Sequence, residues 1–160
     1  MQNLSELMRR LIAADVEFVL VGGFAAVAHG VTLVTRDVDI CCRFTEANLM
    51  RIQKAFADLH PAHRPRTDLP LNLTPDQCAS LRNLYLKTDL GIVDCLGEVL
   101  GVGAFDEVAQ HAVEIELPSG KCRVLDIGTL ICAKEAMNRD QDRITVKYLK
   151  EIQKTRLSTE

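Results

Sequence analysis

The sequence predicts one domain of mixed α/β (α+β) class, in which helices flank a mixed β-sheet. The chain has 160 residues, of which 48% are apolar, and its net charge is only −3. That is enough apolar material for one core, and too much for a disordered chain. Short strand-like apolar runs alternate with segments of helical periodicity, and no repeat or linker separates them. We therefore expect residues 1–160 to form a single domain, with two helices from about residue 127 packed on it.

The first part of the chain follows the order helix, strand, helix, strand, helix. Apolar residues between Leu4 and Ile12 recur at helical spacing, and Thr45 is a residue type that caps helices. Gly30 is suited to end a helix. The expected elements are a helix over 4–12, a strand over 17–21, a helix over 24–29, a strand over 37–43 and a helix from 45 to about 59.

The second part begins with an irregular stretch. Residues 60–70 contain three prolines and no periodicity, which predicts a loop. Turn residues then separate pairs of strand-like runs, which favours hairpins. The expected elements are strands over 84–87 and 92–96, a short helix over 105–110, strands over 113–117 and 122–125, and helices over 127–137 and 140 to about 154.

Composition excludes several classes of protein. The six cysteines include no C-x-x-C pair, so we expect reduced and mostly buried thiols rather than a zinc site. A sequence pI of about 5.8 lacks the basic signature of a nucleic-acid-binding domain. The chain has no apolar run of 18 residues and no signal-peptide pattern, so we expect a soluble cytoplasmic protein without a membrane partner.

Gly22-Gly23 follows the first strand and precedes a helix. Without side chains, these glycines would let a phosphate approach the backbone, and the start of a helix offers N–H groups and a positive dipole. A tight strand-to-helix turn without any ligand explains the same pair. The glycines therefore indicate a phosphate site only in combination with other residues.

Three aspartates provide that combination. Asp37 and Asp39 occupy positions i and i+2 of a strand, so their carboxylates project from one face about 6.5–7 Å apart along the chain. An exposed edge strand is the alternative explanation. Asp94 stands alone in an apolar run, where a charge is costly unless it is paired or metal-bound. If the two strands are neighbours, the cluster suits two Mg²⁺ or Mn²⁺ ions arranged for attack at phosphorus.

This combination resembles the nucleotidyltransferase superfamily, the polymerase-β-like group, and in particular its small bacterial members related to abortive-infection toxins. The likeness extends from residue 18 to about 149. The residues that match the pattern are Gly22, Gly23, Ala25, His29, Gly30, Thr35, Asp37, Asp39, Asp94, Lys134, Arg139 and Asp142. The chain departs from the pattern at Leu33 and Val34, where a basic residue is usual, at Gln141, where a lysine is usual, and at Thr145, where an aspartate is usual.

The resemblance implies a nucleotidyltransferase-like fold and a role for each matching residue. Asp37, Asp39 and Asp94 would bind Mg²⁺ or Mn²⁺, and Asp94 would also accept the proton of the attacking hydroxyl. Gly22 and Gly23 would hold the β- and γ-phosphates of a nucleoside triphosphate, with Thr35 beside them. Lys134 would neutralise triphosphate charge, although a surface lysine on a helix is an equal alternative.

The expected function is transfer of a nucleoside monophosphate from an NTP to an acceptor hydroxyl, with release of pyrophosphate. The acceptor stays open between a small molecule, an RNA end and a protein. The acceptor site would come from the loop over residues 60–70, the terminal helices, a second copy of the chain in a homodimer or a partner protein. One alternative is a catalytically degenerate regulatory module that binds a nucleotide or a partner, as in toxin–antitoxin pairs. Another is a phosphate-handling hydrolase on a different α/β fold.

The histidines and the charged face of the last helix are expected to have structural rather than catalytic roles. His29 is expected to pack at a helix end, and His60 and His63 to lie in a solvated loop, with acceptor contact as the minority option. The last helix carries an apolar stripe and a basic stripe. The basic stripe is read as a solvated face, with steering of an anionic acceptor such as RNA as the alternative. The apolar stripe is Ile144, Tyr148 and Ile152, and the basic one is Arg143, Lys147, Lys150 and Lys154.

Overall fold

A computed structural model describes residues 2–159. Its main feature is a mixed sheet of eight strands in the order β4-β3-β5-β6-β2-β1-β10-β9, beside a small two-stranded sheet of β7 and β8. The strands are β1 Phe18–Val21, β2 Asp37–Cys42, β3 Ala62–His63, β4 Arg66–Pro70, β5 Asn83–Thr88, β6 Gly91–Leu96, β7 Glu98–Val99, β8 Gly103–Ala104, β9 Ala112–Leu117 and β10 Gly120–Leu125.

Helices connect these strands and cover the sheet. They are α1 Leu4–Ala13, α2 Gly22–Ala28, α3 Glu46–Ala55, α4 Pro75–Ser80, α5 Phe105–Gln110, α6 Ile127–Met137 and α7 Asp140–Thr159, with a short 3₁₀ helix at Ala57–Leu59. Side-chain caps start several of them: Thr45 accepts from the Asn48 N–H, and Asp126 accepts from the Thr129 N–H. The single α/β domain with a mixed sheet is therefore confirmed within the described residues.

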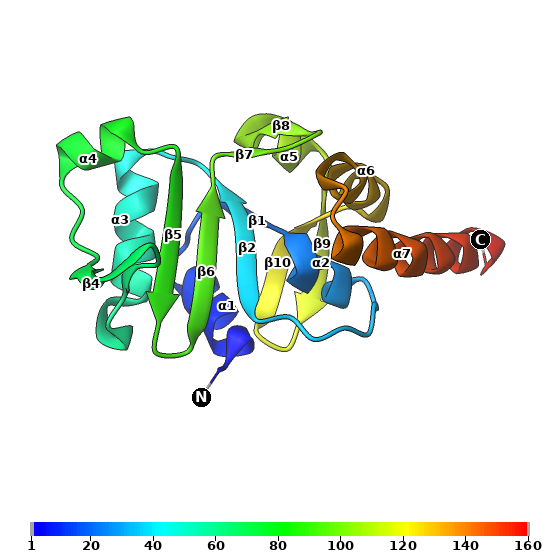
Figure 1. Ribbon diagram of the computed structural model, residues 1–160, viewed down its shortest axis with the longest axis horizontal. Coiled ribbons are helices and arrows are strands. Elements are labelled where there is room, and N and C mark those ends of the chain that lie inside the picture. Colours follow the sequence, from blue (N-terminus) through cyan, green and yellow to red (C-terminus); the bar gives the residue numbers. More distant parts are fainter. Residues whose placement is uncertain (1, 160) are drawn as a thin grey trace.

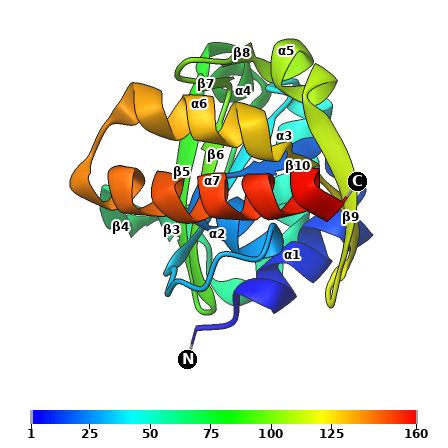
Figure 2. The same ribbon diagram turned by 90° about the vertical axis from the view of Figure 1, so that its right-hand side faces the viewer.

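The middle of the sheet combines parallel and antiparallel pairs. β2 pairs in parallel with β6 on one side and antiparallel with β1 on the other, and β1 pairs in parallel with β10. Helices α3 and α4 lie at the opposite side of the molecule from α6 and α7, which run side by side (Figures 1 and 2). α2 packs against β1, β2 and α6, and α1 packs against α3 and the strands β2 and β10.

The apolar core lies between the sheet and these helices. Alternate residues of β2 point into this core and away from it. Val38 and Ile40 are fully buried, whereas Asp37 and Asp39 are only partly buried. Leu7 and Leu11 of α1 and Ile52 of α3 are also fully buried. The period-two pattern of β2 thus turns its aspartates to one face and Val38 and Ile40 to the other.

The prediction of a loop over residues 60–70 is wrong. This stretch forms a hairpin of β3 and β4, and β3 pairs antiparallel with β5 at the edge of the sheet. The strands are short and β4 is exposed along its whole length, so neither apolar alternation nor burial marks them in the sequence. Proline is tolerated because β4 is an edge strand.

Other differences concern helix ends and the last helix. α2 begins at Gly22, so the glycines belong to the first turn of the helix, and α7 continues to Thr159. The short helix α4 begins at a Thr74 capping box and is not among the expected elements. In α7 the stripe begun by Ile144 and Tyr148 faces solvent, because the buried side of the helix consists of Asp142, Thr145, Val146 and Leu149.

The thiols match expectation. All six cysteines are free and five of them are buried, with Cys132 exposed. Among the described helices, none is both long enough and apolar enough to cross a membrane.

Candidate functional site

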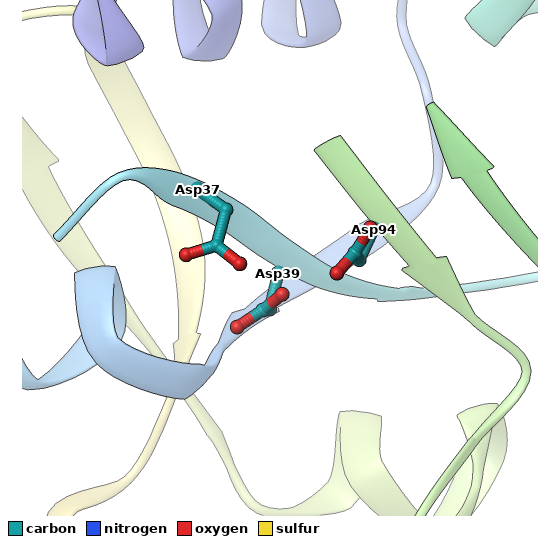
Figure 3. Close-up of side chains that lie close together, drawn as sticks. All are labelled: Asp37, Asp39 and Asp94. Carbon is teal, nitrogen blue, oxygen red and sulfur yellow. The ribbon is translucent and has the colours of Figure 1, made fainter. Parts of the chain in front are cut away.

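Three carboxylates converge at the centre of the sheet, as Figure 3 shows. Asp37 and Asp39 lie two residues apart on β2, and Asp94 on β6 stands opposite Asp39 in the parallel register. One carboxylate oxygen from each residue lies within 4.8 Å of the other two. The two strands are therefore neighbours, which is the condition under which the sequence places the three carboxylates together, and their pairing brings a residue from the middle of the chain to a pair near its start.

Gly22 makes the close packing around Asp39 possible. Val21 pairs with Asp39 across β1 and β2, so the chain enters α2 directly beside this carboxylate. A Cβ atom at Gly22 would lie 2.3 Å from Oδ2 of Asp39, and the φ angle of Gly22 is +73°. Only glycine adopts such a conformation at no steric cost, and only glycine leaves room for the carboxylate. The requirement for Gly22 is thus tied to Asp39.

The cluster is electrostatically strained in the absence of a cation. Burial, together with the charges of Asp37 and Asp94, raises the pKa of Asp39 from 3.8 to about 7. Lys134 and Arg139 act in the opposite direction on the same group. A carboxylate held at such a pKa gains most from a nearby positive charge, which is the property expected of a cation ligand.

Arg64, at the tip of the β3–β4 hairpin, supplies a positive charge that the sequence does not reveal. Its Nη2 donates to both carboxylate oxygens of Asp94, each at 2.8 Å. Burial raises the pKa of Asp94, and the hydrogen bond and charge of Arg64 offset part of that rise. The guanidinium also lies over the ring of Tyr85, 5.3 Å from its centre. No local signal identifies Arg64, because the contact depends on where β3 pairs in the sheet.

A second charged group joins the two terminal helices. Asp142 is fully buried, and Lys134 is only 6% exposed. Lys134 Nζ lies 3.3 Å from Oδ1 of Asp142, and Arg139 Nε donates to its Oδ2 at 2.6 Å. Burial alone would raise the pKa of Asp142, but the hydrogen bonds from the Arg139 side chain and backbone and the charge of Lys134 lower it overall. The surface-lysine interpretation of Lys134 is therefore wrong.

The three aspartates, Lys134 and Arg139 line one cleft of about 880 Å³. Its polar part holds the aspartates, Lys134 and Arg139, and another part is apolar, including Leu130 and the exposed Leu100. The cleft is lined by Val21, Gly22, Gly23, Leu33, Val34, Thr35, Arg36, Asp37, Asp39, Asn83, Tyr85, Ile92, Asp94, Leu96, Glu98, Val99, Leu100, Leu130, Ala133, Lys134, Met137, Arg139, Gln141 and Thr145. A mouth that combines carboxylates, cations and apolar walls suits a ligand with both an anionic and an apolar part.

The other expected residues divide between the cleft and the rest of the molecule. Thr35 lines the cleft, and its hydroxyl donates to the Asp37 carbonyl at 3.2 Å. His29 is buried at the end of α2, where its Nε2 lies 2.8 Å from the Leu125 carbonyl, so the packing role is confirmed. His60 is exposed and lies 2.6 Å from Asp89, and His63 is part of β3. Neither of these two histidines lines the cleft.

The carboxylate cluster has the donor set of a divalent-cation site. Oxygen ligands suit Mg²⁺ and Mn²⁺, and the gap left by Gly22 keeps one of the three carboxylates in place. The three residues fit such an ion because their carboxylates lie close together, so that a shared cation would offset their mutual repulsion.

Comparison with known proteins does not assign the chain to a family. No protein-family model matches the chain, and no curated protein matches it either.

Proposed function

We propose that this protein is a metal-dependent nucleotidyltransferase, which moves a nucleoside monophosphate from an NTP to an acceptor hydroxyl. The observation that supports this proposal most directly is the convergence of Asp37, Asp39 and Asp94 on a cleft that also contains Lys134. Three carboxylates at this spacing are suited to Mg²⁺ or Mn²⁺, which would polarise the phosphoryl oxygens and stabilise charge on the leaving group. The resemblance noted in the sequence points to the same chemistry.

In this proposal the residues around the carboxylates have specific tasks. The backbone of Gly22 and Gly23 binds phosphate oxygens, because these positions carry no side chain to exclude them. Lys134 supplies a positive charge from the buried side of the cleft, where Asp142 fixes its position. Asp94 accepts the proton of the acceptor hydroxyl. The acceptor oxygen forms a bond to the α-phosphorus. The bond between the α-phosphorus and the oxygen that bridges it to the β-phosphorus breaks, and pyrophosphate leaves.

A regulatory module that binds a nucleotide without transferring it is the second candidate. Two observations favour it: Arg64 is already paired with Asp94, and Thr145 lines the cleft at a place where the resembled pattern has an aspartate. This candidate predicts metal-dependent NTP binding without product. The first candidate predicts product in at least one acceptor pool.

A label-transfer assay tests the proposal. Each α-³²P nucleoside triphosphate is incubated with the protein and Mn²⁺ or Mg²⁺, with tRNA, a protein extract and a small-molecule pool as separate acceptors. The inactive variant is Asp37→Asn/Asp39→Asn. The matched control is Asp68→Asn, which removes a 73% exposed carboxylate from the edge strand β4.

Transfer of label by the wild type and by Asp68→Asn, but not by the double variant, is the expected result. Labelling of one pool also identifies the acceptor class. Metal-dependent NTP binding without any labelled acceptor favours the regulatory module instead. A protein that neither binds nor transfers an NTP overturns both.

A further inference from the structure

The tip of the β3–β4 hairpin contacts one member of the carboxylate cluster, Asp94, through the side chain of Arg64. Arg64 lies in the turn of this hairpin, and its backbone N–H donates to the Tyr85 carbonyl at 2.9 Å. Tyr85 is the cross-strand partner of Asp94. The backbone contact, the ring of Tyr85 and the ion pair to Asp94 therefore hold one residue at three points.

The guanidinium of Arg64 occupies the place on Asp94 where a metal ion would bind. A single nitrogen, Nη2, lies 2.8 Å from both carboxylate oxygens, so it occupies the region between them that a bidentate metal ion would take. The side chain of Asp94 is 12% exposed, so its charge requires a partner, whereas that of Arg64 is 41% exposed and can move into solvent. The partner that is easier to displace is thus the arginine.

We propose that Arg64 is a positioning residue that occupies Asp94 in place of a divalent cation, so that metal binding and docking of the hairpin tip oppose each other. This inference rests on the metal site of the proposed function, which it deepens. Without a metal, Arg64 neutralises Asp94 and fixes the hairpin tip against β5. When a cation binds Asp94, Arg64 is released beside this cleft-lining residue, and its charge becomes free to contact an anionic substrate.

The proposal has a reciprocal consequence. If docking of Arg64 weakens metal binding, metal binding must loosen the docked hairpin by the same factor. A purely structural role predicts the reverse, since an arginine that only orients a ligand strengthens metal binding and is held more firmly when the metal is present. The sign of the effect consequently separates the two roles.

The first measurement is calorimetric titration of the full chain with Mn²⁺ alone. The variants are Arg64→Gln, Arg64→Lys and Arg66→Gln, and the last removes a 67% exposed arginine from the same hairpin, paired only with the exposed Asp68 among the described residues. We expect Arg64→Gln to bind Mn²⁺ about 5- to 30-fold more tightly than the wild type, the range for loss of a charge-assisted pair that is partly exposed. Arg64→Lys should lie between them, and Arg66→Gln should match the wild type.

The second measurement is hydrogen exchange of residues 62–70, with and without Mn²⁺. We expect faster exchange with the metal in the wild type and Arg66→Gln, and no change on metal addition in Arg64→Gln. Unchanged or weaker Mn²⁺ binding by Arg64→Gln, or slower exchange of the hairpin with metal, overturns the proposal. If neither the wild type nor Arg64→Gln binds Mn²⁺, the metal site of the proposed function fails as well. This result is distinguishable from the results that overturn only the role of Arg64.

Discussion

Asp39 is the single residue whose charge is most informative about the site. Its pKa is raised from 3.8 to about 7 by burial and by the charges of Asp37 and Asp94. Between about pH 4 and pH 7 the unfolded chain loses this proton and the folded chain keeps it. The free energy of unfolding of the metal-free protein therefore decreases with rising pH across this window, and the full loss is present above about pH 7.

Asp39→Asn removes this pH dependence, because the amide resembles the protonated carboxyl in shape and carries no charge. In EDTA at pH 8 we expect the variant to be more stable than the wild type by on the order of 1–3 kcal/mol, with the difference vanishing near pH 4. Urea unfolding at several pH values measures it, with Asp68→Asn as the exposed control. Equal stability of Asp39→Asn and wild type at pH 8 would contradict the electrostatic strain described for the cluster.

Individual residues also differ in how far the sequence can predict them. Asp94 is identifiable because a lone carboxylate in an apolar run needs a partner, and the parallel register confirms its place beside Asp39. The buried position of Lys134 could not be told from a surface one, since Asp142 meets it only after α6 and α7 pack. Arg64 could not be identified from a local sequence pattern, because its contact with Asp94 depends on how the strands pair.

At the level of elements, α6 and α7 are joined by a buried charge. Asp142 is fully buried between Lys134 and Arg139, and replacing it with asparagine leaves the buried ammonium of Lys134 without a counter-charge. We expect Asp142→Asn to lower the free energy of unfolding by about 2–4 kcal/mol. Because the pKa of Asp142 is lowered in the folded state, its contribution is present at neutral pH and is lost as the pH falls through that pKa.

Asp140→Asn is the matched control for this prediction. Asp140 begins the same helix, its side chain is 92% exposed, and it pairs with Arg143 at the surface. We expect a change within about 0.5 kcal/mol of the wild type. Denaturant unfolding at pH 7 compares the two variants, and similar losses in both would mean that the buried position of Asp142 is not what matters.

Elements with strong local signals were predictable, and those set by neighbours were not. The strand that carries Asp37 and Asp39 and the helix capped by Thr45 agree with the structure to within a few residues at their ends. The β3–β4 hairpin has two short strands and an exposed edge, so its prolines suggested a loop. In α7, Ile144 and Tyr148 are exposed because the buried face of the helix is formed by Asp142, Thr145, Val146 and Leu149, with Asp142 paired to Lys134 of α6.

On the scale of the whole molecule, the cleft is assembled from distant parts of the chain. β2 and α2 come from the N-terminal part of the chain, β6 from the middle, and α6 and α7 from the end (Figure 1). Asp37, Asp39 and Asp94 link the first two of these parts, since they lie on neighbouring strands that are far apart in sequence. An ion bound by all three carboxylates would therefore act as a cross-link between β2 and β6 in the folded state only.

Such an ion stabilises the fold by mass action, because the unfolded chain does not bring the three carboxylates together. At Mn²⁺ concentrations about 100-fold above Kd the gain is about 2.7 kcal/mol, which corresponds to a rise of roughly 5–10 °C in Tm for a domain of this size. Thermal unfolding with Mn²⁺, with EDTA and with KCl of equal ionic strength measures this effect. The Asp37→Asn/Asp39→Asn variant should lose the shift and Asp68→Asn should keep it. An equal shift in the double variant would place the bound ion elsewhere on the molecule and remove the main support for phosphoryl-transfer chemistry in this cleft.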